Sequence, residues 1–566
     1  MAPHGSGKRL ASVNSHSGGT RRPVRAANAR AHPSRRVSMR GCYLCANGRE
    51  IMSTRKHAIE AYFQSGVRLH GAGRLAEAEN VYRQILATEP GHADSLHMLG
   101  VIASQCGQPQ AALGCFDRAI ALKPSAALFH VNRAGTLLTL RQLDAAREAC
   151  QAALRLKRNS AEAYQVLGHV LSDLGRPEEA IAAYRDALRH KPDLPDVYNN
   201  VGLALRQGGR LEEAAVALRE AVKRAPQDPQ AQSNLAGVLK ELGRLAEAES
   251  CYRQALRRHP EDAVLHVNLA IVLLLSGRFD EGWREYEWRF RAGAAHVPAC
   301  DQPRWNGEDL AGRTLLIRAE QGMGDTIQFG RYVAMAASRG RVVLEVQPGL
   351  RHLLSGIVPA ENIALVGEPL PKFDLWCPLL SLPYIFGMQA PAPPYLRADA
   401  ARVATWRERI GAHGRKVGIA WQGNPTSAAE RGRSVPLREF APLAQVEGVR
   451  LISLQKHHGL DQLAASAFPI ETLGETFDSG PEAFIDTAAV MQCLDMVITS
   501  DTSIAHLAGA LARPVWVALQ HVPDWRWLAD GENCFWYPTM RVFRQAKRGD
   551  WADVFTRIAA TLRASP

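Results

Sequence analysis

The turn Gly175-Arg176-Pro177 is followed 34 residues later by Gly209-Arg210-Leu211, and after the same interval by Gly243-Arg244-Leu245. The period extends in both directions to seven turns. The other four are Gly73-Arg74-Leu75, Gly107-Gln108-Pro109, Arg141-Gln142-Leu143 and Gly277-Arg278-Phe279. A fixed period of this length with a turn at its centre is typical of helical hairpins stacked into a solenoid. The sequence therefore predicts a helical array over residues 53–292.

Each repeat also carries the side chains that two closely packed helices need. The first helix has a small residue at one position: Gly66, Gly100, Ala134, Gly168, Gly202, Ala236 and Ala270. The second helix has a large residue at the matching position in most repeats: Tyr82, Phe116, Tyr184, Leu218, Tyr252 and Tyr286, with Cys150 as the exception. Proline closes most repeats, where it stops a helix. These features identify tetratricopeptide (TPR) repeats, whose concave surface binds other chains.

Asparagine recurs two residues before the small position of the first helix. The column consists of Asn132, Asn200, Asn234 and Asn268, and Val166 interrupts it. A carboxamide has both a donor and an acceptor and so matches a peptide unit. The column resembles the asparagine ladder in the TPR arm of protein O-linked N-acetylglucosamine transferases, which implies a peptide-binding groove. Asparagines that only satisfy a neighbouring turn are the alternative.

The last repeat ends in an aromatic face. Trp283, Tyr286 and Phe290 share one side of a helix, where a terminal repeat would need a polar cap. We expect this face to dock on the domain that follows.

The N-terminal stretch holds most of the net charge. The whole chain has 566 residues and a formal charge of +12. Residues 1–52 carry ten Lys/Arg and one acidic residue, so they contribute +9 (10 − 1), and the rest carries +3 (12 − 9). We expect residues 1–52 to be disordered, and the balanced remainder argues against a nucleic-acid partner. Met52 is a candidate native start, and a genuine basic tail is the alternative.

Compartment and membrane association follow from what the chain lacks. No run approaches the roughly 20 apolar residues of a membrane span, and no apolar segment follows the twin arginines. Only Cys42 and Cys45 form a close cysteine pair, without a second pair to complete a zinc site. We expect a cytoplasmic protein.

From residue 314 the chain alternates strand-like and helical segments. The expected strands cover residues 314–319, 341–346, 362–366 and 373–376, then 416–421, 449–454, 496–500 and 514–519. A proline-rich linker at 391–394 separates the two series. Two successive series of this kind predict two parallel-sheet domains, over residues 293–398 and 399–566, with ligands at the carboxyl ends of their strands.

The first of three candidate loops follows the first strand. Gln321, Gly322, Gly324 and Asp325 stand where that strand gives way to a helix. The glycines let backbone approach a ligand, and Asp325 would lie at the rim of a cleft. An aspartate that only caps the helix is the alternative.

The second loop opens an alanine-rich helix. Asp501, Thr502 and Ser503 lead into it, and His506 lies one turn further on. The unpaired N–H groups and positive dipole end of such a helix favour a phosphate. Capping roles for Asp501 and Ser503, and a structural role for His506, are the alternatives.

The third loop combines a glycine turn with cations. Gly423 and Asn424 follow a strand, and Arg433 and Ser434 stand in the cationic segment after them. This arrangement predicts a diphosphate clamp. Arg431 is more readily a solvated surface arginine. Trp421 and Gln455 are candidates for binding a nucleotide base from their loop positions alone.

Together, these loops resemble the heptosyltransferase-like glycosyltransferases. The tail resembles their TPR-fused bacterial branch in two runs, Asp524-Trp525-Arg526-Trp527 and Trp536-Tyr537-Pro538-Thr539-Met540-Arg541. The matching motifs are Gly-x-Gly-Asp at 322–325, Trp-x-Gly-Asn-Pro at 421–425 with Arg-Ser-x-Pro-Leu at 433–437, and Asp-Thr-Ser-x-x-His at 501–506. The resemblance implies a GT-B fold of two Rossmann-type domains behind the TPR solenoid. It also implies that Asp325 is the general base, that residues 501–506 bind the nucleotide diphosphate, and that Arg433 lies beside the leaving phosphate. Ser503 replaces a glycine common in heptosyltransferases, which leaves the donor sugar open.

The resulting hypothesis is a glycosyltransferase that moves a sugar from a nucleotide-diphosphate donor to a protein in the TPR groove, with Asp325, Arg433 and His506 as catalytic residues. No Asp-x-Asp pair occurs after residue 300, so we expect no metal and no cofactor beyond the donor. Two alternatives stay open. One is transfer to lipopolysaccharide or another glycan, and the other is a non-catalytic TPR scaffold with a decayed transferase domain.

Overall fold

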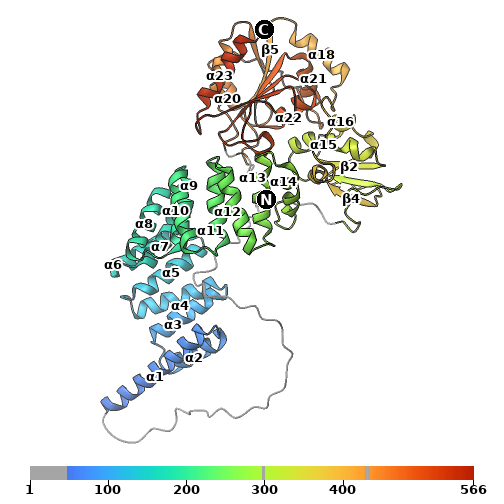
Figure 1. The fold of residues 1–566 in the computed structure, drawn as a ribbon. Coiled ribbons are helices and arrows are strands. Elements are labelled where there is room, and N and C mark those ends of the chain that lie inside the picture. The colour runs from blue at the N-terminus through green and yellow to red at the C-terminus, as the bar shows by residue number, and fades with distance from the viewer. Residues whose placement is uncertain (1–47, 296–299, 427–429, 431, 566) are drawn as a thin grey trace. The chain divides into compact units, whose positions relative to one another are not determined.

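The computed structural model describes residues 48–295, 300–426, 430 and 432–565 (Figure 1). The described chain forms two compact units, which divide between Ala225 and Pro226. The expectations for the N-terminal stretch, including the cysteine pair, lie almost wholly outside the described residues. The first helix begins at Gly48, upstream of Met52. Arginine, glutamate and methionine favour a helix, which explains the earlier start.

The first unit is an array of helical hairpins. Consecutive helices pair in the order that the repeats predict. They are α1 (Gly48–Gly71), α2 (Leu75–Thr88), α3 (Ala93–Gln105), α4 (Pro109–Leu122), α5 (Ala127–Thr139), α6 (Leu143–Leu156), α7 (Ala161–Asp173), α8 (Pro177–His190), α9 (Pro195–Gln207) and α10 (Leu211–Arg224).

The period has a clear steric origin. A Cβ added to Gly168 would lie 2.4 Å from Tyr184 Cε1, so the small position exists to admit the ring of the partner helix. At the turns the chain enters the left-handed region, where glycine costs nothing. Gly175 has φ of +72°, and Arg141 takes the equivalent position with φ of +60°. The one turn without glycine thus keeps the same backbone shape.

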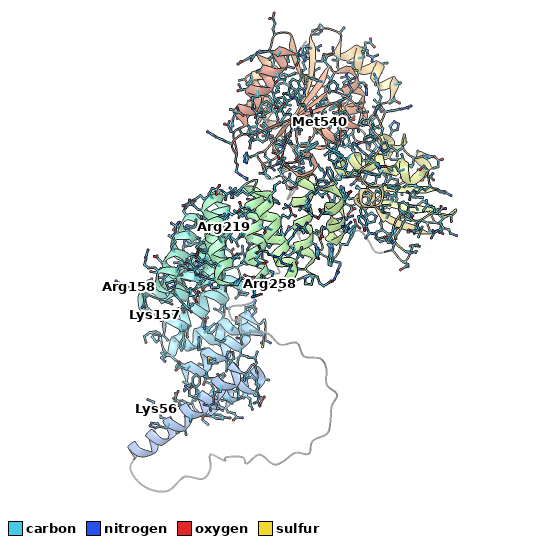
Figure 2. All side chains as sticks on the ribbon, in the orientation of Figure 1. Lys56, Lys157, Arg158, Arg219, Arg258 and Met540 are labelled. Atoms are coloured by element: carbon cyan, nitrogen blue, oxygen red, sulfur yellow. The ribbon has the colours of Figure 1, made fainter. Side chains whose placement is uncertain are left out.

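The second unit begins with the last two repeats. Their elements are α11 (Pro229–Glu241), α12 (Leu245–Arg258), α13 (Ala263–Leu275), α14 (Phe279–Tyr286) and the 3-10 turn η1 (Glu287–Arg289). Arg258, labelled in Figure 2, donates from Nη1 to the carbonyl of Pro226 at 2.8 Å and so ties the end of α12 to the start of the unit.

Two wholly parallel sheets follow the repeats. The first has strand order β3-β2-β1-β4, and the second β6-β5-β7-β8-β9. The first comprises β1 (Leu315–Arg318), β2 (Val342–Val346), β3 (Ile363–Leu365) and β4 (Leu375–Pro378). The second comprises β5 (Arg415–Ala420), β6 (Val449–Ser453), β7 (Met496–Ser500), β8 (Val515–Leu519) and β9 (Met540–Arg544). Sequence reasoning missed β9, which pairs in parallel with β8 and contributes the buried Met540 labelled in Figure 2.

Helices cover the sheets as expected of alternating β/α units. Around the first sheet lie α15 (Met323–Ala337), α16 (Arg351–Leu354), η2 (Ala360–Asn362), η3 (Leu379–Ser381) and α17 (Leu382–Phe386). Around the second lie α18 (Ala400–Ile410), η5 (Leu437–Phe440), α19 (Ala441–Ala444), α20 (Asp461–Ala464), α21 (Ile485–Cys493), α22 (Ser503–Ala510), η6 (Trp525–Trp527) and α23 (Trp551–Ala564). Among the described residues, no helix is long and apolar enough to cross a membrane.

The final repeat is part of the α/β core. Trp283 packs edge-on against Trp525 and Phe329, with ring centroids 5.2 and 5.6 Å apart. Tyr286 is also buried in this cluster, which confirms the expected docking face. Phe290 differs, because α14 ends at Tyr286. Its ring lies 4.1 Å from the Arg289 guanidinium instead.

A buried ion pair reinforces this attachment. Arg289 donates from Nε and Nη2 to the two carboxylate oxygens of Glu320, at 2.8 and 2.9 Å. Both side chains are at most 1% exposed. Arg289 also donates to Ser381 Oγ at 2.7 Å, and Glu320 accepts from the Leu380 N–H at 3.0 Å. The pair therefore joins η1 to the end of β1.

We expect residues 226–566 to fold as an independent fragment and residues 293–566 to fail. The shorter fragment leaves Glu320 buried without its cation and exposes the surface that Trp283 and Tyr286 cover. Thermal unfolding followed by circular dichroism is the measurement. A cooperative transition of the 293–566 fragment near the temperature of the longer one would contradict the expectation.

Two matched substitutions in the 226–566 fragment compare the contribution of the buried ion pair to the free energy of unfolding with that of an exposed ion pair. Arg289→Met should cost about 3–5 kcal/mol, because it strands a buried carboxylate. Arg291→Met should cost less than about 1 kcal/mol, since Arg291 pairs with Glu261 at an exposed site.

Candidate functional site

The second unit brings the first two candidate loops together. Helix α15 starts at the carboxyl end of β1, and α22 starts at the carboxyl end of β7. The two helices pack on each other. A Cβ on Gly324 would lie 3.1 Å from His506 Cδ2 and 3.4 Å from the Ser503 Cα. Glycine at this position thus permits the loops of the two sheets to meet.

Asp325 both caps its helix and forms an ion pair. Its Oδ2 accepts the Gly322 N–H at 2.9 Å, which is the capping role considered as the alternative. Its Oδ1 accepts a hydrogen bond from Arg526 Nη2. The side chain is 17% exposed, so it lies at the rim of the cluster. The cap therefore orients a carboxylate that still has access to solvent.

Arg526 is the main residue that sequence reasoning missed. It lies in η6, after β8, and donates from Nη1 to Asp524 Oδ1 at 2.7 Å. Its guanidinium lies 4.1 Å from the ring centre of Trp525. Burial opposes its charge, but Asp325 and Asp524 outweigh burial and raise the pKa of Arg526. The Asp-Trp-Arg-Trp run at 524–527 was visible in the sequence, but nothing in it indicated an ion pair with Asp325.

A second ion pair lies beside the first. Arg433 contacts Asp501 Oδ2 from both Nε and Nη2, each at 2.7 Å. Burial raises the pKa of Asp501, and Arg433 opposes that rise. The Asp524 pKa is lowered, because Arg526 and Arg433 outweigh its burial. The sequence-predicted residues Asp325, Arg433 and Asp501 therefore belong to one buried charge cluster.

His506 is enclosed by aromatic side chains. Its Nδ1 lies 3.2 Å from the Tyr537 hydroxyl, and its ring stacks on Trp527 with centroids 4.9 Å apart. Burial, reinforced by Arg526 and Arg433, holds the pKa of His506 well below its usual value. The imidazole is therefore neutral at physiological pH. A neutral, enclosed ring is suited to positioning, and its catalytic role stays a prediction.

The start of α22 leaves backbone donors without a side-chain cap. Thr502 is the N-cap residue, and its side chain makes no capping bond. Its Oγ1 instead lies 3.4 Å from Thr499 Oγ1. Thr502 and Ser503 are half-buried. Uncapped N–H groups at a helix start are the donors that an anion uses.

The third loop lies next to this helix start. Gly423 donates its N–H to Ser434 Oγ at 3.3 Å, and a Cβ on Gly423 would lie 3.8 Å from Thr502 Cγ2. Ser434 in turn donates to Glu430, a carboxylate that sequence reasoning did not single out. Asn424 is exposed and accepts from the Thr426 N–H at 3.0 Å. Arg431 lies outside the described residues.

The two candidates for base binding have structural roles here. Gln455 Oε1 accepts the N–H groups of Trp421 and Gln422, and its Nε2 donates to the carbonyls of Gln422 and His458. Trp421 is fully buried and donates to the Gly459 carbonyl at 3.2 Å. Both side chains tie the β5 and β6 loops together in this conformation.

The last repeat reaches the first candidate loop directly. Gln321 Nε2 donates to the Tyr286 hydroxyl at 2.8 Å, and the Gln321 carbonyl accepts from Gln347 Nε2 at 2.6 Å. Tyr286 is the large residue of the final repeat. A side chain that the repeat pattern selects for packing therefore also positions the loop of Asp325.

Three of the four asparagines of the column, Asn132, Asn200 and Asn268, bond to the preceding repeat, and Asn234 bonds within its own helix. Asn132 Nδ2 lies 2.7 Å from His97 Nε2, and Asn200 Nδ2 lies 2.8 Å from His169 Nε2. An amide nitrogen has no lone pair to accept with, so in both pairs the asparagine donates. In the second unit Asn268 Nδ2 donates to Ser233 Oγ at 3.5 Å, and Asn234 Oδ1 accepts from Gln230 at 3.0 Å.

These bonds leave one side of each amide available. All four asparagines are half-buried. The side-chain oxygens of Asn132, Asn200 and Asn268 receive no hydrogen bond among the described residues. The alternative that the asparagines only satisfy neighbouring groups therefore holds for their amide nitrogens. Their oxygens can still accept hydrogen bonds from another chain.

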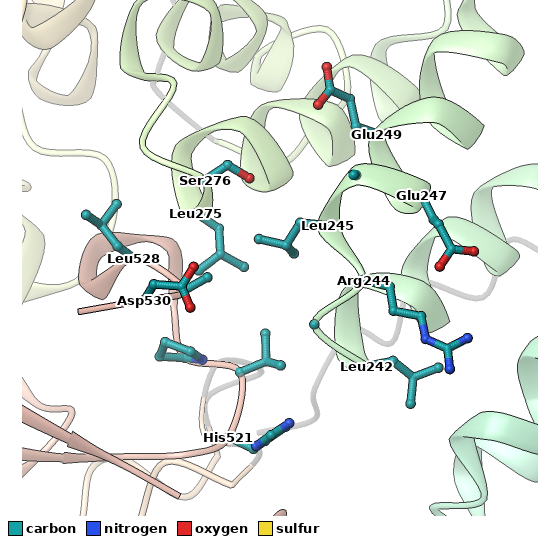
Figure 3. Close-up of a pocket in the computed structure, with 15 residues that line it drawn as sticks. Leu242, Arg244, Leu245, Glu247, Glu249, Leu275, Ser276, His521, Leu528 and Asp530 are labelled. Atoms are coloured by element: carbon teal, nitrogen blue, oxygen red, sulfur yellow. The ribbon is translucent and has the colours of Figure 1, made fainter. Parts of the chain in front are cut away.

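A cavity of about 880 Å³ lies elsewhere in the second unit (Figure 3). It is bordered by the turn of repeat six, the end of α13 and segment 521–530. The side chains of Leu245 and Leu275 face it in Figure 3, with His521 and Asp530 at its edge. None of the sequence-predicted site residues lines it. Segment 521–530 nevertheless contributes to both places, because Asp524 and Arg526 belong to the charge cluster.

Comparison with known proteins covers the repeats best. The family model of the cilia and flagella-associated protein 70 C-terminal domain matches residues 44–283. The N-terminal half is a TPR array. Protein FlbA of Caulobacter vibrioides is 30% identical over 317 residues, which cover 50% of this chain and 52% of FlbA. The chain thus spans about half the length of this curated relative.

Solved TPR structures match parts of the chain. A thermophilic TPR protein of Thermus thermophilus is 27% identical over 32% of this chain and 99% of its own, with a TM-score of 0.29. PilF of Pseudomonas aeruginosa is 20% identical over 42% of this chain and 99% of its own, with a TM-score of 0.35. At these scores the likeness does not extend to a shared overall structure.

The pair between the buried His97 and Asn132 predicts that the first unit loses stability in acid. Burial lowers the pKa of His97 to about 4 from an ordinary value of 6.5. Unfolded His97 binds a proton as the pH falls through 6.5, whereas folded His97 resists until about 4. Its contribution to stability is therefore complete above pH 6.5 and is lost as the pH falls to 4, a loss of about 3 kcal/mol.

His97→Gln should remove this loss, because a glutamine oxygen accepts from Asn132 without titrating. Hydrogen exchange of α3 and α5 amides in the full chain, at pH 7 and pH 4, measures the opening free energy. His190→Gln, at an exposed histidine, is the control and should behave like wild type. Equal acid loss in wild type and His97→Gln would refute the assignment.

Proposed function

We propose that this protein is a glycosyltransferase that uses a nucleotide-diphosphate sugar, and that its α/β half has the GT-B fold. The observation that carries the proposal is the convergence of Asp325, Arg433 and the uncapped start of α22 at the carboxyl ends of two parallel sheets. Ligands of open parallel sheets bind at this edge. Three motifs far apart in sequence thus supply one site.

The groups fit the needs of sugar transfer. Negative charge develops on the departing diphosphate, and the N–H groups of α22 with Arg433 can stabilise it without a metal. Asp325 can accept the proton of the acceptor hydroxyl, because its cap fixes its orientation and its rim position leaves it accessible. His506, neutral and enclosed, supports the start of α22.

A protein acceptor fits the TPR array better than a free glycan. In the first unit the oxygens of Asn132 and Asn200 can accept backbone N–H groups of an extended polypeptide without reading its side chains, and in the second unit the oxygen of Asn268 can do the same. Their amide nitrogens are fixed by the preceding repeat, so each oxygen is preorganised. We place this activity in the cytoplasm, where nucleotide sugars are available to the enzyme.

Asp325→Asn should lower kcat by about 10²–10⁴-fold, because the carboxamide caps the helix but cannot accept a proton. Binding of a nucleoside diphosphate, measured by thermal shift, should persist. Asp309→Asn, in a loop before β1, is a matched control. Loss of diphosphate stabilisation in Asp325→Asn would assign the residue to donor binding instead.

Replacing Asn132, Asn200, Asn234 and Asn268 together by alanine should abolish transfer to a protein acceptor and leave donor hydrolysis unchanged. Loss of the accepting oxygens weakens only the hold on the polypeptide. Intact-mass analysis of the acceptor is the readout, and Asn80→Ala, outside the column, is the control. Undiminished protein glycosylation would show that the asparagine column does not hold the acceptor, whereas transfer to a glycan that survives the replacement would favour the glycan-acceptor alternative.

A further inference from the structure

Every cation of the charge cluster already has a carboxylate partner. Arg433 is paired with Asp501, and Arg526 with both Asp325 and Asp524. Three carboxylates and two guanidinium groups sum to −1 (2 − 3). A diphosphate brings at least two further negative charges into this buried place. Burying unpaired charge is costly, so an anion can enter only if a carboxylate leaves its partner or is neutralised.

The two arginines differ in how firmly they are held. Arg526 is fixed by two carboxylates, one on each terminal nitrogen, and by the ring of Trp525, and its side chain is 7% exposed. Among the described residues, Arg433 has Asp501 as its single carboxylate partner, contacts one oxygen of it, and is 21% exposed. Arg433 is therefore the cation with which an incoming anion can pair in place of Asp501.

Asp501 stands next to the place that a diphosphate would occupy. It directly precedes Thr502, the N-cap of α22, whose first N–H groups have no side-chain cap. Its carboxylate pairs with Arg433, so a negative group already holds this arginine one residue before the uncapped helix start. An arginine and the free N–H groups of a helix start are what an anion site offers to a ligand.

We propose that Asp501 pairs with Arg433 in place of the diphosphate while the site is empty. When the ligand binds, its phosphate pairs with Arg433 instead, and Asp501, which has lost its partner, binds one proton from solvent. This inference rests on the proposed donor site and adds how that site exchanges charge. The balance is simple, since one carboxylate becomes a carboxylic acid and one Arg–carboxylate pair becomes an Arg–phosphate pair. No bond other than O–H forms.

The surroundings of Asp501 favour its neutral form once Arg433 has left. Besides Arg433, the groups that act on Asp501 are Asp524 and Trp527 of segment 524–527. The neutral His506 lies near Arg433 and Asp524 in the same cluster, and Asp325 of α15 joins the cluster through Arg526. Arg433 comes from the loop after β5. Burial already raises the Asp501 pKa against the pull of Arg433, and the like charge of Asp524 adds to that rise.

Isothermal titration calorimetry of the full chain tests the exchange. The probes are UDP, GDP, ADP and inorganic pyrophosphate, titrated at pH 7.5 in two buffers of different ionisation enthalpy. Uptake of about one proton per site is expected for a probe that binds. The affinity should then fall by about tenfold per pH unit above neutrality, as linkage to one proton requires.

Asp501→Asn should abolish the proton uptake and flatten the pH dependence, while binding persists. Asp495→Asn, at a surface aspartate paired with Lys416, is the matched control and should bind like wild type. Arg433→Gln supplies a second variant should Asp501→Asn fail to fold. It should lower the affinity for the probe by about 10–100-fold and also abolish the proton uptake, because Asp501 in this variant has no arginine partner that binding could remove.

The outcomes separate the two levels of inference. Binding by wild type with no net proton uptake overturns the exchange and leaves the donor site standing. Absence of binding by all four probes overturns the donor site itself, and the exchange with it. Uptake that survives in Asp501→Asn assigns the proton to another group and also overturns the proposal.

Discussion

The buried pair between Arg289 and Glu320 is the constraint on which the second unit depends. One partner ends η1 after the last repeat, and the other lies two residues after β1, directly before the loop of Asp325. A buried ion pair adds little net stability compared with apolar packing, but removing one partner is severe. The pair therefore fixes how the repeats join the α/β region more than it adds stability. Tyr286, three residues before Arg289, extends the same junction to Gln321.

The parts of the fold that repeat or alternate could be predicted from the sequence. The 34-residue period marks every hairpin, because Gly168 and its equivalents must admit a ring and the turns must enter the left-handed region. Buried parallel strands are mostly apolar, with their few charged residues near the strand ends, so eight of them could be predicted. The edge strand β9 alternates Arg541 and Arg544 with apolar residues and follows a run of aromatic residues, which hides it.

The site could be predicted only where a local motif marks it. Asp325, Arg433 and Asp501 lie in glycine or hydroxyl-rich loops at strand ends, and a parallel sheet brings such loops to one edge. Arg526 and Asp524 lie in a tryptophan-rich segment whose meaning depends on a partner about 200 positions away, the separation between Arg526 and Asp325. Likewise, the pairing of Asn132 with His97 depends on how neighbouring repeats stack. Contacts of this kind become visible only once the chain has folded.

A buried anion site has to remain stable when it is empty. Uncompensated arginines beside a helix start would repel one another and pay the cost of desolvation. Asp325, Asp501 and Asp524 remove that cost by pairing with the arginines. The consequence is that a ligand must compete with internal carboxylates, which lowers affinity. For the donor site proposed above, a small anion that cannot reach both Arg433 and the N–H groups of α22 would gain too little to displace Asp501. The same carboxylates that stabilise the empty site can therefore make it selective for a ligand with two linked phosphates.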